Sequence, residues 1–224
     1  MSADGSQIRD AATVIVMRPI AGVRHVLMGQ RGAKAAFMPS KFVFPGGAVD
    51  AGDRAIALEK PVPDRCATRL NAQSEAGLGH ALAVAAIREL WEETGLALGA
   101  PGPWEDPPHD WVEFARLGLR PDARALRFVF RAITPPGRPR RFDARFFLLP
   151  AEALTGDLDD FSRASDELSH LQWIEIKAAR QLDLPFITEV VLAELDAADP
   201  LVAPASVPFF RNDDEESLFL RLRG

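Results

Sequence analysis

The sequence predicts an α/β protein, with strands and helices packed as a mixed sandwich, and three observations support this fold class. The first is a pair of Val- and Ile-rich segments, 11–17 and 23–28, near the start of the chain. The second is a strong helical pattern over 80–91, and the third is a group of β-forming segments that begins near residue 126. Strands on both sides of one dominant helix favour layers of sheet and helix around a shared core.

The first part of the chain is expected to form a hairpin followed by a short strand. Proline and glycine separate the segments 11–17 and 23–28, which predicts a turn between two strands. A strand at 42–44 follows, and Gly46 and Gly47 after it predict a tight turn at which the backbone could approach a ligand.

The helix at 80–91 is the best-defined element. Before it, prolines and glycines make 53–79 a long excursion with one helical turn at most, around 55–59, and loops of this length are usually functional or disordered. Apolar residues then recur at helical spacing, and Gly95 is placed to end the helix. The recurring residues are Leu82, Ala83, Ala86, Ile87 and Leu90.

The remainder is predicted to alternate loops with short elements. Segment 101–121 is rich in loop residues, and turn residues at 134–139 separate two β-forming runs. In chain order, the expected elements are a short helix near 112–117, strands at 126–133, 145–149 and 171–176, and a helix at 187–195.

Length and composition indicate an ordinary globular protein. With 224 residues, 47% of them hydrophobic, the chain suits one domain. A net charge of -6 argues against a partner held by a broad basic face, such as nucleic acid. Cys66 is the only cysteine, so an intramolecular disulfide is impossible and a reducing compartment fits. Met1 to Asp10 lacks the layout of a signal peptide, no apolar run is long enough to cross a membrane, and we expect a cytoplasmic protein.

Three glutamates on the predicted helix form the main candidate site. Residues three and four apart share a helix face, so Glu89, Glu92 and Glu93 point the same way. Like charges at this spacing destabilise a helix by roughly 0.2–0.5 kcal/mol a pair, which divalent cations could reverse. Arg88 is close enough to orient one carboxylate. The alternative is a solvated acidic face, the usual role of glutamates on a surface helix.

The string from Arg88 to Leu96, Arg-Glu-Leu-Trp-Glu-Glu-Thr-Gly-Leu, resembles the second half of the Nudix box. In the first half, Gly47 is followed after five residues by Asp53, where the family usually has Glu. Asp53 lies 35 positions before Arg88 instead of the usual eight, so residues 54–79 are an insertion inside the box.

The resemblance implies a fold, a reaction and a set of site residues. It implies a Nudix-like α/β/α sandwich with a central mixed β-sheet, one domain over 1–224 that ends in a C-terminal helix and tail at 178–224. It implies hydrolysis of a diphosphate linkage with Mg²⁺ or Mn²⁺. The implied metal ligands are Glu89, Glu92 and Glu93. The implied catalytic residues are Glu89, Arg88 and Glu167, and Asp166 and Asp160 are alternatives to Glu167. Gly46 and Gly47 would let the backbone approach the phosphates of the substrate.

The interrupted box also resembles one Nudix branch, whose animal members are coenzyme A diphosphatases. Segments 133–135 and 140–147 look like that branch as well. Arg31 matches an arginine of the coenzyme A signature, while Ala35, Ala36 and Met38 depart from the Leu, Arg and His expected there.

Arginines offer a second group of candidate substrate contacts. Arg31 and Arg141 are the candidates, because guanidinium groups bind phosphate in bidentate geometry. Arg141 belongs to a basic segment that also contains Arg138, Arg140 and Arg145, which could equally be solubilising charges on a hairpin.

The predicted partner is therefore a small nucleoside-diphosphate compound, with no nucleic acid and no membrane, and a homodimer stays open. Coenzyme A or acyl-coenzyme A is the first choice, and ADP-ribose and dinucleotides are alternatives. Two other classes of function are open: a catalytically silent module that binds nucleotides, and a structural protein, which would show no metal dependence.

Overall fold

The computed structural model describes residues 7–33, 35, 37–196, 202, 204–212 and 216–223. Within them, a sheet of nine strands has the order β11-β10-β7-β8-β1-β2-β3, with β4 paired to β1 and β9 paired to β2. β1–β8 and β7–β10 are parallel and the other pairs are antiparallel, so the sheet is mixed, as predicted. The strands are β1 (Ile8–Ile20), β2 (Val23–Arg31), β3 (Phe42–Val43), β4 (Gly46–Ala48), β7 (Arg127–Ile133), β8 (Arg141–Pro150), β9 (Leu168–Glu175), β10 (Val207–Asn212) and β11 (Ser217–Leu222).

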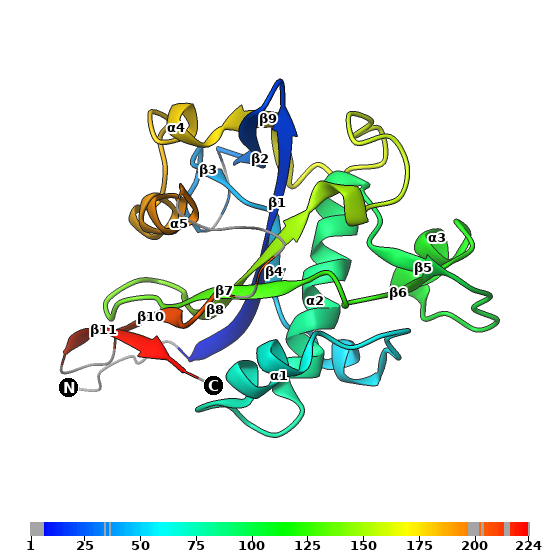
Figure 1. Ribbon diagram of the computed structural model, residues 1–224, viewed down its shortest axis with the longest axis horizontal. Helices are drawn as coiled ribbons and strands as arrows, with labels where there is room; N and C mark the ends of the chain where they lie inside the picture. The colour runs from blue at the N-terminus through cyan, green and yellow to red at the C-terminus, as the bar shows by residue number, and fades with distance from the viewer. Residues whose placement is uncertain are drawn as a thin grey trace.

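Helices cover both faces of this sheet (Figure 1). Helix α2 (Leu78–Thr94) packs on one face, where its apolar residues share a core with Val14, Phe128 and Phe147. Helices α4 (Ile176–Ala179) and α5 (Phe186–Asp196) cover the other face over a second core. The predicted α/β/α layering is confirmed. None of the described helices combines the length and apolar character needed to cross a membrane.

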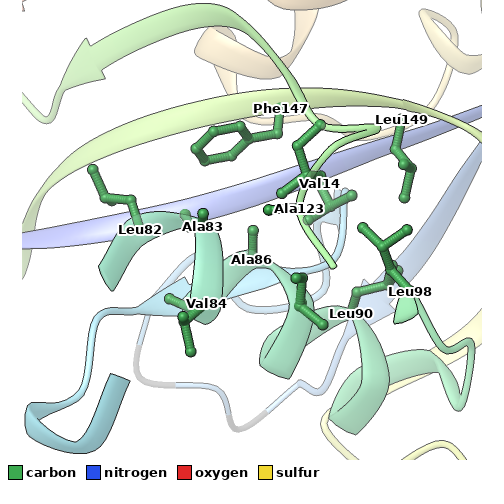
Figure 2. Close-up of a cluster of buried hydrophobic side chains, with 14 of the residues drawn as sticks. Val14, Leu82, Ala83, Val84, Ala86, Leu90, Leu98, Ala123, Phe147 and Leu149 are labelled. Carbon is green, nitrogen blue, oxygen red and sulfur yellow. The ribbon is translucent and has the colours of Figure 1, made fainter. Parts of the chain in front are cut away.

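Helix α2 lies close against the sheet because small residues face the strands. Ala83 and Ala86 point toward the strands that carry Val14 and Phe147 (Figure 2). The helix begins after Gly77 and ends at Gly95, both in the left-handed conformation that glycine adopts without strain. The sequence therefore predicts this helix and its end correctly, and the structure begins it two residues earlier.

The N-terminal hairpin of β1 and β2 is confirmed, but the tight turn at Gly46 and Gly47 is wrong. These glycines form β4, which pairs with β1. A side chain is missing there because of crowding: a Cβ on Gly46 would lie 2.7 Å from the Cα of Thr13. Gly46 therefore marks a close approach of backbones within a sheet.

The insertion contains more structure than predicted. Residues 56–60 are not helical, so the expected turn at 55–59 is wrong. A 3-10 helix, η1 (Ala51–Ala55), precedes them, and helix α1 (Asp64–Asn71) follows. Because α1 has only eight residues and begins directly after a proline-rich stretch, its apolar repeat is too short to detect.

Two pairs of short strands were not predicted. β5 (Gly99–Pro101) pairs with β6 (Leu119–Pro121) around η2 (His109–Trp111) and α3 (Val112–Ala115), which is a shortened form of the expected helix at 112–117. In the expected C-terminal tail, β10 and β11 form a hairpin that extends the sheet. Of that tail, residues 197–201, 203, 213–215 and 224 lie outside the described residues, as do Met1 to Ser6 and Ala36.

Buried arginines tie the insertion to the sheet. Arg131 forms a two-pronged ion pair with Asp143, at 2.9 and 2.6 Å, and donates to the carbonyls of Ala72 and Gln73 just beyond α1. Arg145 pairs with Asp10 at 2.5 Å and donates to Ser74 Oγ at 3.1 Å. Arg145, part of the predicted basic segment, is thus a buried structural residue.

Replacing Asp143 by Asn should lower the free energy of unfolding by about 3–5 kcal/mol, because the buried guanidinium groups of Arg131 and Arg145 lose their shared counter-charge. Urea denaturation followed by circular dichroism measures the change. The exposed Asp106→Asn variant is the control and should stay within about 0.5 kcal/mol of the wild type. Equal stability of both variants would contradict the structural role of this ion pair.

Candidate active site

The last turns of α2 and the chain just after β4 meet at the side chain of Arg88. This guanidinium group is buried and donates from Nε and Nη2 to the two carboxylate oxygens of Asp53, at 2.9 and 3.0 Å. Nη2 also donates to the carbonyl of Ala48 at 3.0 Å. Nη1 donates to Glu89 Oε1 at 2.8 Å and Glu92 Oε2 at 3.2 Å. One side chain therefore joins the helix to the strand and loop before the insertion.

Asp53 occupies the position that the box pattern gives to Glu, and it is buried beside Arg88 across the insertion. Its Oδ2 also accepts the backbone N–H of Asp50 at 2.8 Å. Burial lowers the pKa of Arg88, but the hydrogen bond to Asp53 and the charges of Glu89, Asp53 and Glu92 outweigh it and raise that pKa overall. The insertion therefore leaves the two halves of the box in contact.

The three glutamates lie around this arginine with different exposure. Glu93 is almost fully buried, and its Oε2 accepts the N–H of Gly46 at 2.7 Å. The side chain of Glu89 is 12% exposed and that of Glu92 is 36% exposed. The prediction that these carboxylates share one face is met, and the alternative of a fully solvated acidic face is not.

Burial and mutual repulsion raise the pKa values of these carboxyl groups above the ordinary value of glutamate. Burial raises the pKa of Glu89 to about 7 despite the neighbouring Arg88, and the charge of Glu92 adds to the rise. Burial and the charge of Glu89 raise the pKa of Glu93 to about 8, against the opposing effects of the Gly46 N–H and of Arg31. The pKa of Glu92 is raised as well, chiefly by burial. The cluster holds more negative charge than its surroundings stabilise.

Gly47 provides space for one of these carboxylates. A Cβ at this position would lie 2.6 Å from Glu89 Oε2, so any side chain here would displace the carboxylate. Gly46, its neighbour, supplies the N–H that Glu93 accepts. The structure therefore brings both predicted glycines to the glutamate cluster.

Glu167 reaches the same cluster from the turn before β9. The N–H of Ser165 donates to the carbonyl of Glu92 at 2.8 Å, which fixes this turn against the end of α2. Next to burial, the charge of Glu167 contributes to the raised pKa of all three glutamates. Its rival Asp160 instead accepts a hydrogen bond from the N–H of Ser162 at 2.9 Å.

The two predicted substrate arginines occupy different places. Arg31, at the end of β2, is close enough to Glu93 to lower the pKa of that carboxyl. Arg141 is buried at the start of β8, where it donates to the carbonyls of Thr134 and Asn212. These hydrogen bonds join β8 to the residues that follow β7 and to the end of β10. They do not support a substrate role for Arg141, which stays a prediction.

Two further acidic residues near the cluster were not predicted. Asp50 Oδ2 lies 3.7 Å from Arg88 Nη2, and its spacing of three from Asp53 resembles a helix capping box, a signal that the sequence does contain. Asp110, in η2, contributes to the raised pKa of Glu92. No sequence pattern connects Asp110 with α2, because η2 and α3 are too short to give a clear periodic pattern.

The donor set suits a hard divalent cation, although each carboxylate accepts a hydrogen bond from another group. Glu89 and Glu92 face Arg88, Glu93 faces the Gly46 N–H, and in the described chain no three His, Cys, Asp or Glu side chains are gathered to hold one metal ion. Carboxylate oxygens are the preferred ligands of Mg²⁺ and Mn²⁺. Three partly or fully buried carboxylates with raised pKa values are short of positive charge, so the residues present fit such an ion.

Comparisons with known proteins agree with this geometry. A crystal structure of a Nudix hydrolase from Alicyclobacillus acidocaldarius matches 88% of this chain and 94% of its own, with a TM-score of 0.68 and 30% sequence identity. Nudix hydrolase 7 of Caenorhabditis elegans is 31% identical over 185 residues, which cover 77% of this chain. No family model matches the chain.

A third relative is the acyl-coenzyme A diphosphatase NUDT19 of Gallus gallus, 29% identical over 205 residues that cover 62% of this chain. The matched regions are 53% of the worm protein and 54% of the chicken protein, so the chain spans about half the length of these curated relatives.

Without divalent cations, stability should fall as the pH rises from about 4.5 to about 8. Glu89 and Glu93 keep their protons in the folded protein up to pKa values of about 7 and 8, whereas the unfolded chain releases them near 4.5, so folding binds protons in this window. Thermal unfolding in a chelating buffer measures this slope, and Glu93→Gln should flatten it. Mg²⁺ or Mn²⁺ should raise the wild-type Tm most at pH 8; equal pH slopes in both proteins would contradict the raised pKa values.

Alanine at Gly46 should harm the fold more than alanine at Gly47. A Cβ on Gly46 meets the backbone of β1, which cannot move freely, so the expected loss is about 1–3 kcal/mol. A Cβ on Gly47 meets only the end of the flexible Glu89 side chain, so stability should change less than in Gly46→Ala. Urea unfolding of both variants checks this difference, and the reverse order would refute it.

Proposed function

The chain belongs to the Nudix hydrolase superfamily, and we propose that it hydrolyses the diphosphate linkage of a nucleoside-diphosphate derivative with the help of Mg²⁺ or Mn²⁺. The observation that carries this proposal is the cluster of Glu89, Glu92 and Glu93 around Arg88 at the end of a buried helix. A binding module would gain nothing from three carboxylates whose burial raises their pKa values. This consideration favours a hydrolase over a silent nucleotide-binding module.

Glu89, Glu92 and Glu93 would hold the divalent ion. When bound, such an ion supplies positive charge that offsets the charge developing on phosphate oxygens during cleavage. Arg88 contacts one carboxylate oxygen of Glu89 and one of Glu92, and the Gly46 N–H contacts one of Glu93, so the second oxygen of each would be the one that holds the ion. Gly47 has no side chain that would displace the Glu89 carboxylate from its place.

Two residues are candidates for taking a proton from the attacking water. Glu89 is one, because Arg88 positions its carboxylate through Nη1 and because burial raises its pKa to about 7 in the metal-free protein. Glu167 is exposed and sits on a turn that is fixed to α2, so it can approach a substrate from the open side. In this mechanism Arg88 is a positioning residue, because its donors are occupied by Asp53, Ala48 and the glutamates.

Coenzyme A or an acyl-coenzyme A is the first choice of substrate. The support is the similarity to the chicken protein named acyl-coenzyme A diphosphatase and the position of Arg31 beside the cluster, where a phosphate could be bound. ADP-ribose and dinucleotides share the diphosphate that the cluster would act on, so they are the alternative substrates.

The identity of the substrate can be read from the products. With Mg²⁺ or Mn²⁺, we expect coenzyme A to yield 3′,5′-ADP and 4′-phosphopantetheine, separated by liquid chromatography. ADP-ribose, NADH and diadenosine polyphosphates are run beside it. Faster cleavage of one of these would replace coenzyme A as substrate, and no cleavage of any diphosphate with either metal would contradict the proposed function.

The double variant Glu92→Gln/Glu93→Gln should lose turnover by at least about a hundredfold, because the amides remove two charged ligands. It should stay folded, since Gln keeps the size of each side chain. Glu189→Gln, an exposed change on α5 across the sheet, is the matched control. Wild-type turnover in the double variant would exclude this cluster as the catalytic site.

A further inference from the structure

Strand β11 is an open edge of the sheet. In the described part of the chain it pairs with β10 alone, and its outer backbone groups have no strand partner. Proteins usually protect such edges with proline, lysine or a bulge. β11, with the sequence Ser-Leu-Phe-Leu-Arg-Leu, has no proline or lysine and one charged residue, Arg221 near its end, and its register with β10 is unbroken. At the other side of the sheet, β3 has only two residues and the β2–β9 pair contains a bulge.

An aromatic row adjoins this edge. The ring of Phe219, on β11, lies 6.4 Å from that of Phe210 on β10, which in turn lies 6.3 Å from Phe186 at the start of α5. Phe219 is 50% exposed and Phe186 is 67% exposed, so two large apolar rings beside the open edge contact water. Figure 1 shows β10, β11 and α5 together at one side of the molecule. A strand added to β11 would cover Phe219.

We propose that β11 pairs antiparallel with β11 of a second copy of this chain, joining two sheets into one. The two copies would be related by a two-fold axis perpendicular to the joined sheet, so the same face of both sheets points to the same side. With the axis at Phe219, this residue lies opposite the Phe219 of the second copy, and Leu218 lies opposite Leu220. Two aromatic rings then meet at the axis, as cross-strand pairs that stabilise sheets do.

The charges at the two ends of β11 select this partner and this direction. Glu216 precedes the strand, and Arg221 and Arg223 lie at its C-terminal end. Antiparallel pairing of two copies sets each acidic end beside a basic end, twice, whereas parallel pairing would set like charges together. Among the present contacts of these residues are two exposed ion pairs at 3.4 Å, Arg211 with Glu216 and Arg221 with Glu194, which can rearrange at little cost. Arg221 also lies over the ring of Phe219, 5.8 Å from its centroid.

The test is the oligomeric state of the whole chain, measured by sedimentation equilibrium over a range of concentrations. We expect a dimer for the wild type and at least about tenfold weaker association for Phe219→Lys, which sets two like charges directly opposite. Val23→Lys is the matched control: Val23 is a similarly exposed residue (43%) on the β1–β2 hairpin, and its replacement should leave the dimer unchanged. A monomeric wild type, or a dimer indifferent to Phe219→Lys, overturns the proposal.

A second measurement covers the case in which Phe219→Lys does not fold, as judged by circular dichroism. In the proposed register, Phe219→Cys brings two thiols together across the axis at a distance that a disulfide can span. Mild oxidation should then give a covalent dimer on a non-reducing gel, and Val23→Cys should not. Absence of a covalent dimer through position 219 overturns the proposal.

Discussion

The contacts of the Arg88 guanidinium group are the interaction on which the site depends. They connect α2 with Asp53 and with the carbonyl of Ala48, so helix, strand and loop are fixed to one another by a single buried group. Only arginine offers enough donors in a rigid fork for this, since lysine would bring a charge without the geometry. The same group partly offsets the repulsion among the glutamates, which explains how they can share one side of a helix.

This constraint also explains how the chain tolerates a long insertion inside its functional motif. At the start of the insertion, Asp53 binds Arg88. Near its end, Arg131 donates to the carbonyls of Ala72 and Gln73, and Arg145 donates to Ser74 Oγ. Both ends are thus held by buried charged hydrogen bonds before α2 begins. Between these ends, Ile56, Val62, Cys66 and Leu70 of the insertion belong to the same core as α2, so the insertion also packs with this helix.

The sequence predicts well those parts whose cause is local. Helix α2 and its end at Gly95 follow from apolar spacing and from a glycine in the left-handed region, and Glu89, Glu92 and Glu93 follow from helix geometry. It fails where the cause is a distant neighbour. Gly46 and Gly47 are required by the proximity of β1 and Glu89, Arg145 is buried by its pairing with Asp10 and Ser74, and the hairpin of β10 and β11 forms because β7 offers an edge. None of these neighbours is visible in the local pattern.

The most direct test of this account is Mn²⁺ binding to the wild type and to Arg88→Lys, measured by electron paramagnetic resonance of free Mn²⁺. Lysine keeps the positive charge but cannot hold Asp53, Ala48 and the two glutamates at once. If Arg88 organises the carboxylates for a divalent ion, the variant should stay folded and bind Mn²⁺ roughly tenfold to a hundredfold more weakly. Equal Mn²⁺ affinity in the two folded proteins would contradict this role of Arg88.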